Sequence, residues 1–476
     1  MRRRPLLSAL SFVTIATVAS SFAGEREAHA SGYLTARFGA DHGTPAAPNA
    51  YAIYFNPAAL GGTKGTTLHG DLSLALRWVH YQRGADALSP GLNRRNELLA
   101  SQQYIDANTG HANLLNLLAL PFLGVNSDFG TKAFRAGWAV YVPFGGLATW
   151  DKREEQAGSP GTRDGVQRWH NISGQILAVY NTFAAAVVLP EGFSVGASVS
   201  PVIQHVGTVR ARTADDTDEI TFPDGSLKEG RSLIDVTGVN VAASAGVYWQ
   251  GLRENRLKLG LAYLSQPGFG TSRLGGTLEG RVAGGDVKQD VDLLQTWPDV
   301  VRFGAAYRLP SDKVELRTDL EFVRWSVFDK QCLVVKGKDC NVADDGSETG
   351  GTNDVVINIP RNWNNAIGYR LGAAYFANDR LEIFGSGSFT TSAVPKAWID
   401  ASTIDSFRLY GTLGARYELT KKLALAGSYT HIYFMPVDTD GENKFNELRK
   451  PSQSPSSDGK YRSQIGFFNV NVAYAF

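Results

Sequence analysis

The chain has 476 residues, a formal net charge of +1, 20% charged residues and a mean hydropathy of −0.17. A charge balance this close to neutral excludes the dense basic surface that nucleic-acid binding requires. Beyond the N-terminal region, no run of apolar residues approaches the roughly eighteen that a membrane-spanning helix needs. The remaining classes are an exported soluble protein and a transmembrane β-barrel.

The first thirty residues have the pattern of an export signal. Three arginines, Arg2 to Arg4, provide a positive start, and an uncharged, mainly apolar stretch follows over residues 6–23. Ala28-His29-Ala30 then supplies the small residues of a cleavage site. We therefore predict a signal peptide over residues 1–30, with a cut after residue 23 as the alternative. Its removal takes away four arginines and two glutamates, which lowers the formal charge from +1 to −1.

Residues 31–65 lack strand periodicity and are rich in Gly, Ala, Pro and Asn. The apolar cluster at 51–55 is unsuited to a solvated tail, so we expect another part of the chain to bury it. Asn56-Pro57 predicts either an ordinary turn or a rigid hinge, because Pro57 fixes one backbone dihedral and biases Asn56 to extended geometry.

Period-two alternation recurs from residue 66 to the C-terminus. Near the end, for example, Phe468 and Val470 share one face while Asn469 and Asn471 share the other. The connections alternate between short and longer, which is typical of an outer-membrane barrel with both termini in the periplasm. The predicted fold class is therefore all-β, a 14-stranded antiparallel transmembrane β-barrel over residues 66–476. The fourteen predicted segments are approximately 66–82, 112–125, 132–150, 169–189, 192–210, 230–250, 255–281, 299–310, 313–330, 361–377, 379–394, 404–420, 421–437 and 461–476.

A barrel of this strand number is too wide for its own side chains to fill. We therefore expect residues 31–65 to fold into the lumen as an N-terminal hatch, or plug, which would also bury the apolar cluster at 51–55. The second predicted strand is ambiguous. The leucines at 112–120 fit either a strand or a short helix that presents apolar side chains at the outer entrance.

The third predicted strand contains a defect. Pro143 lacks an N–H for the sheet, and Gly145 and Gly146 weaken strand order, so we expect a bulge or break. In hydrocarbon an unpaired backbone is costly unless it lines a cavity or meets protein. The defect therefore suggests a lateral portal at Pro143, Phe144, Gly145 and Gly146. The alternative is that the strand ends at Pro143 and residues 144–149 belong to the loop.

Charged side chains recur on one face of the predicted strand 313–330. With the apolar residues of this strand toward lipid, Arg317, Asp319 and Glu321 point into the lumen, since lipid-facing charges are costly. Arg416 points inward on the same argument. We expect a salt-bridge network that anchors the hatch, and the alternative is that one lumen arginine binds a substrate carboxylate.

Cys332 and Cys340 are the two cysteines of the chain. In an exported protein we expect them to form a disulfide within one loop, and their spacing matches no zinc signature. The eight histidines are scattered, and we find no nucleophile beside a base and no H-E-x-x-H pattern. We therefore predict no enzyme activity, no cofactor and no bound metal.

Several stretches, in order along the chain, match the motifs of one known family. They are Phe55-Asn56-Pro57-Ala58, Val142–Thr149, Asp319–Phe328, the Trp363 segment with Gly368 and Tyr369, and Ser392–Pro395. In these stretches the chain resembles the FadL/TodX (OMPP1) family of outer-membrane transporters for hydrophobic compounds.

The resemblance covers nearly the whole mature chain and implies a monomeric barrel whose hatch blocks straight passage. It also implies that a long-chain fatty acid or aromatic hydrocarbon enters an apolar pocket and leaves sideways, at a kink in the third strand, into the outer membrane. The glycine pair at 145–146 and the loop lengths depart from the family pattern, which leaves the substrate open.

The leading functional hypothesis is passive uptake of hydrophobic compounds across a Gram-negative outer membrane. The expected partners are the hydrophobic small molecule and the outer-membrane lipid, with no nucleic acid. One alternative is a general porin for small polar solutes, which would lack the hatch. The other is a structural or adhesive surface barrel, whose working parts would be the long loops at 83–111, 331–360 and 438–460.

Overall fold

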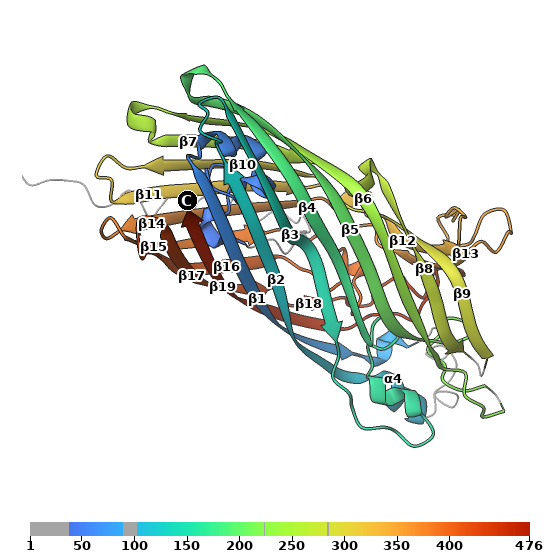
Figure 1. Cartoon of the computed structure of the whole chain (residues 1–476). Coiled ribbons are helices and arrows are strands. Elements are labelled where there is room, and N and C mark those ends of the chain that lie inside the picture. Colours follow the sequence, from blue (N-terminus) through green and yellow to red (C-terminus); the bar gives the residue numbers. More distant parts are fainter. Residues whose placement is uncertain (1–37, 89–101, 223, 283–284) are drawn as a thin grey trace, which may run out of the picture.

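The computed structural model describes residues 38–88, 102–222, 224–282 and 285–476. The predicted signal peptide over residues 1–30 and the first residues of the predicted hatch lie outside these ranges. Within them the chain forms one antiparallel sheet closed into a barrel, with short helices near its N-terminal end and in its connections (Figure 1). The strands are β1 (Thr66–Arg83), β2 (Gly110–Ser127), β3 (Phe134–Thr149), β4 (Ser173–Val188), β5 (Phe193–Arg212), β6 (Gly230–Gly251), β7 (Leu257–Leu264), β8 (Thr271–Val282), β9 (Gly285–Thr296), β10 (Val300–Arg308), β11 (Val314–Val323), β12 (Lys330–Val335), β13 (Val355–Pro360), β14 (Ala366–Phe376), β15 (Leu381–Thr390), β16 (Arg408–Glu418), β17 (Leu423–Phe434), β18 (Val437–Asp438) and β19 (Lys460–Ala475). The helices are η1 (Ala40–His42), α2 (Ala52–Phe55), η2 (Pro57–Gly62), η3 (Ala85–Ala87), α4 (Gln102–Asn108), η4 (Pro160–Asp164), η5 (Pro190–Gly192), η6 (Arg253–Asn255), η7 (Pro267–Phe269), η8 (Trp325–Val327) and η9 (Lys396–Trp398).

The sheet closes because its first strand pairs with its last. β1 pairs with β19 from Thr67 opposite Ala475 to Gln82 opposite Lys460, and with β2 on its other side. Across the described residues, the pairs β7/β8, β9/β10, β11/β12, β13/β14 and β17/β18 are each one strand divided in two. The 19 segments therefore make the 14-stranded antiparallel barrel that the alternation predicts, and this prediction is confirmed.

The outer face of the barrel is apolar. On β1, Leu72 and Leu76 are each 43% exposed, whereas Asp71 and Ser73, the two neighbours of Leu72, are buried. An apolar outer band is what the hydrocarbon of a membrane requires of a barrel. The leucines at 112–120 belong to β2, so the alternative of a short helix there is wrong.

Two of the predicted loops are partly strand. The stretch 282–298 contains β9, which forms a hairpin with β8, and 331–360 begins within β12 and ends with β13. The prediction missed β9 because much of it carries no apolar face. Its first half, with Asp286 and Lys288, is mostly exposed on both faces, so nothing selects period-two alternation there.

The divisions of four neighbouring strands lie side by side in the sheet. They fall at residues 265–270, 297–299, 324–329 and 361–365, between β7 and β8, β9 and β10, β11 and β12, and β13 and β14. Hydrogen bonds still cross this line, since Arg324 N donates to Asp299 O at 3.0 Å. The backbones of the second and third divisions therefore stay hydrogen-bonded to each other at this point.

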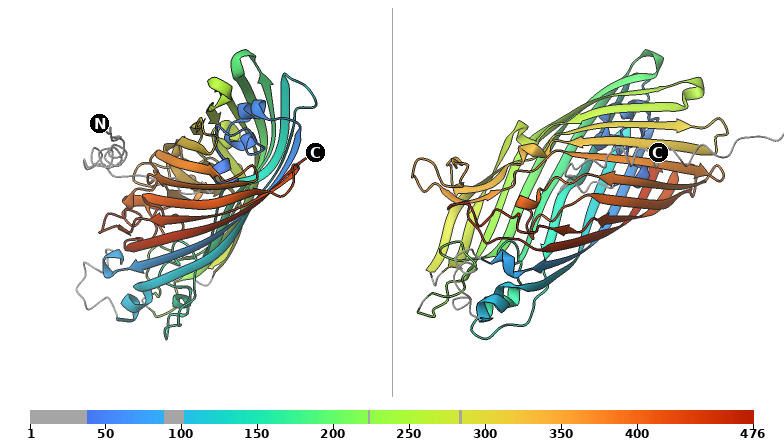
Figure 2. Two further views of the ribbon diagram at one scale, coloured as in Figure 1. Left: turned by 90° about the vertical axis from the view of Figure 1, so that its left-hand side faces the viewer. Right: turned by 180° about the vertical axis from the view of Figure 1, so that it is seen from behind.

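The long connections gather at the end of the barrel opposite the C-terminus, where α4 also lies (Figures 1 and 2). Arg83, at the end of β1, ties several of them together. Its buried guanidinium donates hydrogen bonds to Asp218 Oδ2 at 2.8 Å and to the carbonyls of Ala87, Asn108 and Ser456. One arginine thus ties together three connections over this mouth of the barrel.

The N-terminal segment (residues 38–65) folds into η1, α2 and η2 and packs against the strands (Figure 1). Tyr51, Ile53 and Tyr54 are each no more than 2% exposed, so the apolar cluster at 51–55 is buried as its composition requires. Their burial comes from the barrel, because a segment this short has no core of its own.

Candidate functional site

The ladder between β2 and β3 covers only one end of these strands. It runs from Ser127 opposite Ala136 to Phe122 opposite Tyr141. Beyond that point the described part of β2 pairs with β1 alone, and that of β3 with β4 alone. The two chains meet again beyond this stretch, where Thr149 N donates to Asn116 Oδ1 at 2.7 Å and Asp151 N donates to Asn113 O at 2.9 Å. The barrel wall therefore has a gap between residues 117–121 and 142–148.

A bulge at Pro143 accompanies this gap. The register of β3 against β4 shifts between Tyr141, which faces Tyr180, and Phe144, which faces Ala178. Two residues of β3 therefore oppose one residue of β4, which is the definition of a bulge. Proline cannot donate to a ladder, so it occurs where a partner strand is absent. The irregularity expected at Pro143 is present, and β3 continues to Thr149 instead of ending there.

A cavity lies directly inside the gap. Gly145, Gly146, Leu118 and Leu120 from the gap contribute to its wall, together with residues from strands on the far side. Its volume of about 160 Å³ is an order of magnitude above what one water molecule needs. A small organic molecule or part of a longer one therefore fits.

Apolar side chains continue from the cavity through the gap to the outside of the wall. Tyr410, Phe434 and Phe467 pack together inside, and Val142 and Leu120 at the gap belong to the same cluster. Leu177 and Val179, which lie on the outward face of β4, are partly buried against it. A cluster of apolar side chains thus extends from the cavity to the outward face of β4.

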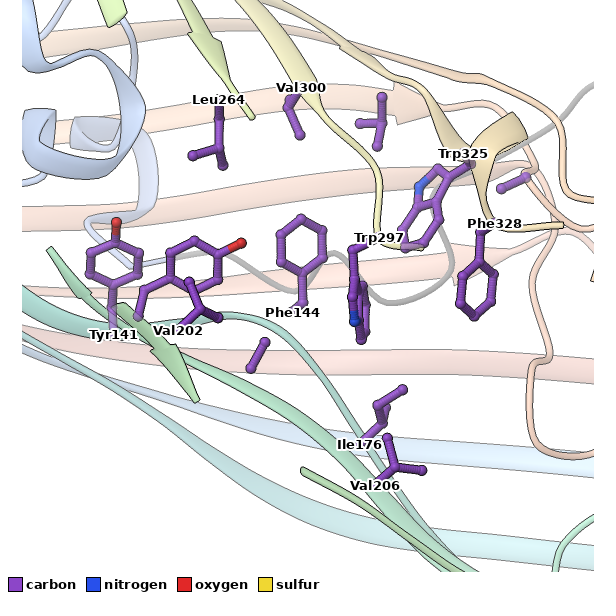
Figure 3. Close-up of a cluster of buried hydrophobic side chains, with 14 of the residues drawn as sticks. Tyr141, Phe144, Ile176, Val202, Val206, Leu264, Trp297, Val300, Trp325 and Phe328 are labelled. Carbon is purple, nitrogen blue, oxygen red and sulfur yellow. The ribbon is translucent and has the colours of Figure 1, made fainter. Parts of the chain in front are cut away.

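A cluster of aromatic side chains lies across the lumen from β3. Phe144 contacts Trp297 and Trp325, with ring centroids 5.3 Å and 6.2 Å apart, and Trp325 stacks edge-on to Phe328 (Figure 3). Trp363 completes the cluster and also lines the cavity. All four of these partners lie at the divisions of the strands, because leaving the ladder lets a large side chain turn inward. The sequence analysis missed this cluster, and three tryptophans at strand ends were the signal for it.

The cavity also has a polar end. Arg361 donates to Asp400 Oδ2 at 2.9 Å and to Gln331 Oε1, and all three are buried. His170 is 8% exposed, and burial lowers its pKa to about 4. Arg210, at the end of β5, is 7% exposed and lines the same space. These groups come from the connections 150–172 and 391–407 and from strand ends near the long connections.

The motif Phe55-Asn56-Pro57-Ala58 makes the closest contacts between the N-terminal segment and the strands. Asn56 is fully buried, and its amide donates to Pro45 O at 2.9 Å and to Val247 O on β6 at 3.1 Å. Its oxygen accepts from Ala58 N, which caps η2, while Pro57 occupies the first turn. The motif is therefore both a helix start and an attachment to the wall.

Three glycines make room for this attachment, and the sequence analysis did not single them out. A Cβ at Gly196 would overlap the backbone of Ala58, one at Gly246 would overlap the Asn56 amide, and one at Gly260 would overlap Pro45 O. They lie on β5, β6 and β7, with Gly196 directly opposite Gly246. Glycine in a strand often marks such a close approach, which was the available signal.

Three of the four predicted lumen charges belong to a network that reaches the N-terminal segment. Glu321 accepts from Arg302, whose Nη2 donates to the Tyr54 hydroxyl at 2.6 Å. Asp319 accepts from Arg370, which also donates to the backbone carbonyls of Ala40 and Gly43.

Arg317 completes this network from β11. It donates to Glu382 Oε1 at 2.8 Å, and Glu382 lies 3.0 Å from His42 Nε2 of the N-terminal segment. The fourth charge, Arg416, pairs with Glu418 on its own strand. Arg317, Asp319 and Glu321 therefore take part in ion pairs that reach the N-terminal segment, and none of the four predicted lumen charges lines the cavity beside the gap.

Two remaining features concern chemistry. Cys332 in β12 and Cys340 in the connection that follows form a disulfide, with Cα atoms 6.2 Å apart. Residues 192–196 have the spacing G-x-S-x-G of some hydrolases, but Ser194 lies in strand β5 and donates to Ala58 O at 2.8 Å. This serine therefore helps to hold the N-terminal segment.

The closed barrel, its apolar outer band and the cavity beside the wall define an outer-membrane transport protein. The family model described as outer membrane protein transport protein (OMPP1/FadL/TodX) matches residues 10–476. The chain therefore belongs to this family, which consists of transport proteins and not of enzymes. In the parts of the chain that the structure describes, no helix has both the length and the apolar character to cross a membrane.

Solved structures share the fold. A FadL homologue from Pseudomonas aeruginosa has a TM-score of 0.72 at 16% identity, covering 94% of this chain and 100% of that one. The toluene transporters TodX of P. putida and TbuX of Ralstonia pickettii have TM-scores of 0.62 and 0.59 at 13% and 14% identity, and each covers 94% of this chain and 99% of its own. A curated relative from Neisseria meningitidis serogroup B, named as an outer membrane protein, is 23% identical over 180 residues. That match spans 38% of this chain and about a third (36%) of the relative.

Proposed function

We propose that the protein takes up hydrophobic compounds by capturing them in the cavity and releasing them sideways through the gap between β2 and β3 into the outer membrane. The observation that carries this proposal is the missing ladder between residues 117–121 and 142–148, directly beside the cavity. Uptake is passive, because the ligand moves down its gradient into lipid. The protein acts as a monomer, and the outer-membrane lipid receives the ligand.

The chemistry of the gap supports a lipid-facing exit. An unpaired stretch of backbone in hydrocarbon costs several kcal/mol per polar group unless it lines a cavity. Here the unpaired stretch lines the cavity, and the side chains across it are apolar. Transfer from water onto such a route is not favourable for a polar solute, whereas a hydrophobic solute stays in apolar surroundings throughout.

We infer that the N-terminal segment is the hatch of this transporter. Its contacts come from strands spread around the barrel, namely β5 through Ser194, β10 through Arg302, β14 through Arg370, β15 through Ser386 and β1 through Asp71. A segment tied to opposite sides of the wall obstructs straight passage. This argues against the alternative of a general porin, whose channel has to stay open.

The experiment that tests the lateral route fills the gap. Gly145→Phe adds a side chain whose Cβ meets Val142 and Leu177 at 3.5 and 3.6 Å, which are ordinary contacts, so the strand tolerates it. The matched control is Gly387→Phe on β15, where a Cβ meets no atom within 4 Å. Uptake of radiolabelled toluene and of radiolabelled dodecanoate is measured in cells that carry each variant in the outer membrane.

We expect Gly145→Phe to slow uptake of the transported compound about tenfold or more, which corresponds to a barrier increase of at least about 1.4 kcal/mol. Gly387→Phe should transport at the rate of the unaltered protein. If Gly145→Phe is folded in the outer membrane and still transports normally, the ligand does not leave between β2 and β3. Transport of neither compound by the unaltered protein would contradict the proposed function itself.

A further inference from the structure

We propose that the outer face of β19, β1 and β2 binds a phosphorylated glycolipid of the outer leaflet of the membrane. Arg462 and a pair of histidines hold the phosphate, and the apolar side chains beside them receive the acyl chains. This face lies on the outside of the wall, so the cavity takes no part in the binding.

A polar row crosses the outer face of these three neighbouring strands near the long connections (Figure 1). The register places Arg462 of β19 opposite His80 of β1, and His80 opposite Asn113 of β2. Arg462 and Asn113 are exposed and His80 is partly exposed, whereas the side chains that alternate with them are buried. Because the long connections of an outer-membrane barrel lie outside the cell, this row marks the external edge of the wall.

The two histidines of this face are held side by side. His80 Nδ1 donates to Asn113 Oδ1 at 2.8 Å, since an amide oxygen only accepts. In the uncharged ring His80 Nε2 is then the acceptor, and His111 Nδ1, 3.3 Å away, is the donor. This chain of hydrogen bonds leaves Nε2 of His111 without a partner in the described parts of the protein. A phosphate beside the ring favours the protonated imidazole, in which this nitrogen also donates.

The positive charge of this face is not balanced by the protein itself. Among the described residues, no carboxylate lies within 4 Å of the Arg462 guanidinium or of either imidazole. Lys460, in the next row, pairs with Asp438 at 3.0 Å. Asp151 approaches only through its backbone, whose N–H donates to Asn113 O. An anion from outside the chain therefore has an unoccupied cation to bind.

Exposed cations on the neighbouring part of the wall differ in this respect. On the hairpin of β8 and β9, Lys288 lies 2.8 Å from Glu279, and Arg281 lies 3.8 Å from Asp286. Their charges are answered within the chain. This contrast singles out the face of β19, β1 and β2 as the place for an external anion.

The rows beside the charges change from polar to apolar in the order that a lipid requires. Trp78 opposite Leu115 forms the next row toward the middle of the barrel, followed by Leu76 opposite Leu117, and all four are exposed. The Trp78 ring stacks on His80 with centroids 6.3 Å apart. Tryptophan is typical of the boundary between head groups and hydrocarbon. At roughly 3.3 Å per residue, Leu76 lies about 13 Å along the strand from His80, which is deep enough for acyl chains.

The chemistry of this face selects a phosphate that is attached to acyl chains. The planar guanidinium of Arg462 can donate two parallel, charge-assisted hydrogen bonds to phosphate oxygens. A soluble phosphate would use the polar row alone, and a lipid without net charge would use the apolar rows alone. A phosphorylated glycolipid uses both.

The bound lipid stands beside the gap between β2 and β3. Leu117 belongs to the stretch of β2 that borders this gap. The acyl chains on the face are therefore the first hydrocarbon that a compound leaving by the proposed route meets. This consequence rests on the proposed function, whereas the binding of the lipid does not.

The test compares lipid A that carries two phosphates with the same lipid A after both phosphates have been removed. Each is titrated into the purified full-length protein in a non-ionic detergent, and native mass spectrometry counts the bound lipid. The variants are Arg462→Gln, Arg462→Lys and the double variant His80→Gln with His111→Gln. Arg281→Gln is the matched control, because it is the same change at another exposed arginine. Inorganic phosphate in excess probes the head group alone, and resistance to unfolding in cold SDS checks that each barrel is folded.

The unaltered protein and Arg281→Gln should bind the phosphorylated lipid about tenfold to a hundredfold more tightly than the dephosphorylated one. Arg462→Gln should lose most of this preference, Arg462→Lys should keep part of it, and the double histidine variant should reduce it about threefold. Inorganic phosphate should not displace the lipid, because the apolar rows supply part of the affinity.

Several results would overturn the inference. They are equal binding of the two lipids by the unaltered protein, binding of neither, displacement by inorganic phosphate, and an unchanged preference in folded Arg462→Gln or in the folded double histidine variant. None of them involves transport, so uptake by Gly145→Phe judges the proposed function separately.

Discussion

The side chain of Asn56 offers the sharpest test of how the N-terminal segment is held. It is fully buried and makes three hydrogen bonds, donating to Pro45 O and Val247 O and accepting from Ala58 N. Asn56→Ala leaves two carbonyls and one N–H without a partner. At about 1 kcal/mol for each neutral hydrogen bond, the loss is about 3 kcal/mol, or roughly a hundredfold in the equilibrium for local opening.

Asn56→Asp provides a second test, because a substitution that keeps the shape of the side chain is ordinarily expected to be milder than Asn56→Ala. It keeps the shape of the side chain and the acceptor for Ala58 N, but it replaces the amide donor with an anion that faces two carbonyl oxygens. The Asp variant should therefore be at least as destabilised as the Ala variant. Asn49→Ala is the matched control, because Asn49 is only half-buried and bonds within the segment, to His42 O and Tyr51 N.

Hydrogen exchange of the backbone amides at 52–62, followed by mass spectrometry in detergent, measures the opening. We expect faster exchange of about a hundredfold in Asn56→Ala, at least as much in Asn56→Asp, and less than about tenfold in Asn49→Ala. The exchange of strand peptides should not change, because the barrel does not depend on this bond. Exchange in Asn56→Ala within about twofold of the unaltered protein would refute the reasoning, and so would an Asp variant milder than the Ala variant.

Two further outcomes follow from the buried charges. Arg302→Met leaves Glu321 without its ion-pair partner and removes the hydrogen bond to Tyr54, so it should destabilise the N-terminal segment by about 3 kcal/mol. The double variant Arg302→Met with Glu321→Gln should recover part of this loss. The absence of any recovery in the same hydrogen-exchange experiment would contradict the pairing. Burial lowers the pKa of His170 to about 4. As the pH falls from about 6.5 to 4, His170 takes up a proton in the unfolded chain before it does so in the folded protein. The free energy of unfolding should therefore decrease by about 3 kcal/mol over this range and should keep its full value above pH 6.5. His170→Gln should reduce this dependence of the unfolding free energy on pH. If the NMR shifts of the imidazole nitrogens show a charged His170 in the folded protein at pH 5.5, the lowered pKa is wrong.

Much of the barrel was predictable because the membrane imposes a strict rule on its outer face. A charge such as Asp319 or Glu321 cannot face hydrocarbon, so the phase of β11 follows from its residues alone. The strand β9 was not predicted because its first half has no apolar outer face. It projects beyond the part of the barrel that needs an apolar face, and without that need its residues show no alternation.

The candidate site was predictable only in part. Pro143 marked a defect in β3, since a residue without an N–H disturbs any ladder. Whether that defect is a strand end, a bulge or a gap depends on the partner strand. β2 has the residues of a complete strand and pairs fully with β1, yet about two thirds of it, residues 110–121, lacks a second neighbour.

The sequence by itself determined the defect at Pro143 and the inward phase of the charges, because both are properties of a single strand. Only the tertiary structure decided that the defect lies beside a cavity and that Trp297, Trp325 and Trp363 gather there, since these residues come from different strands.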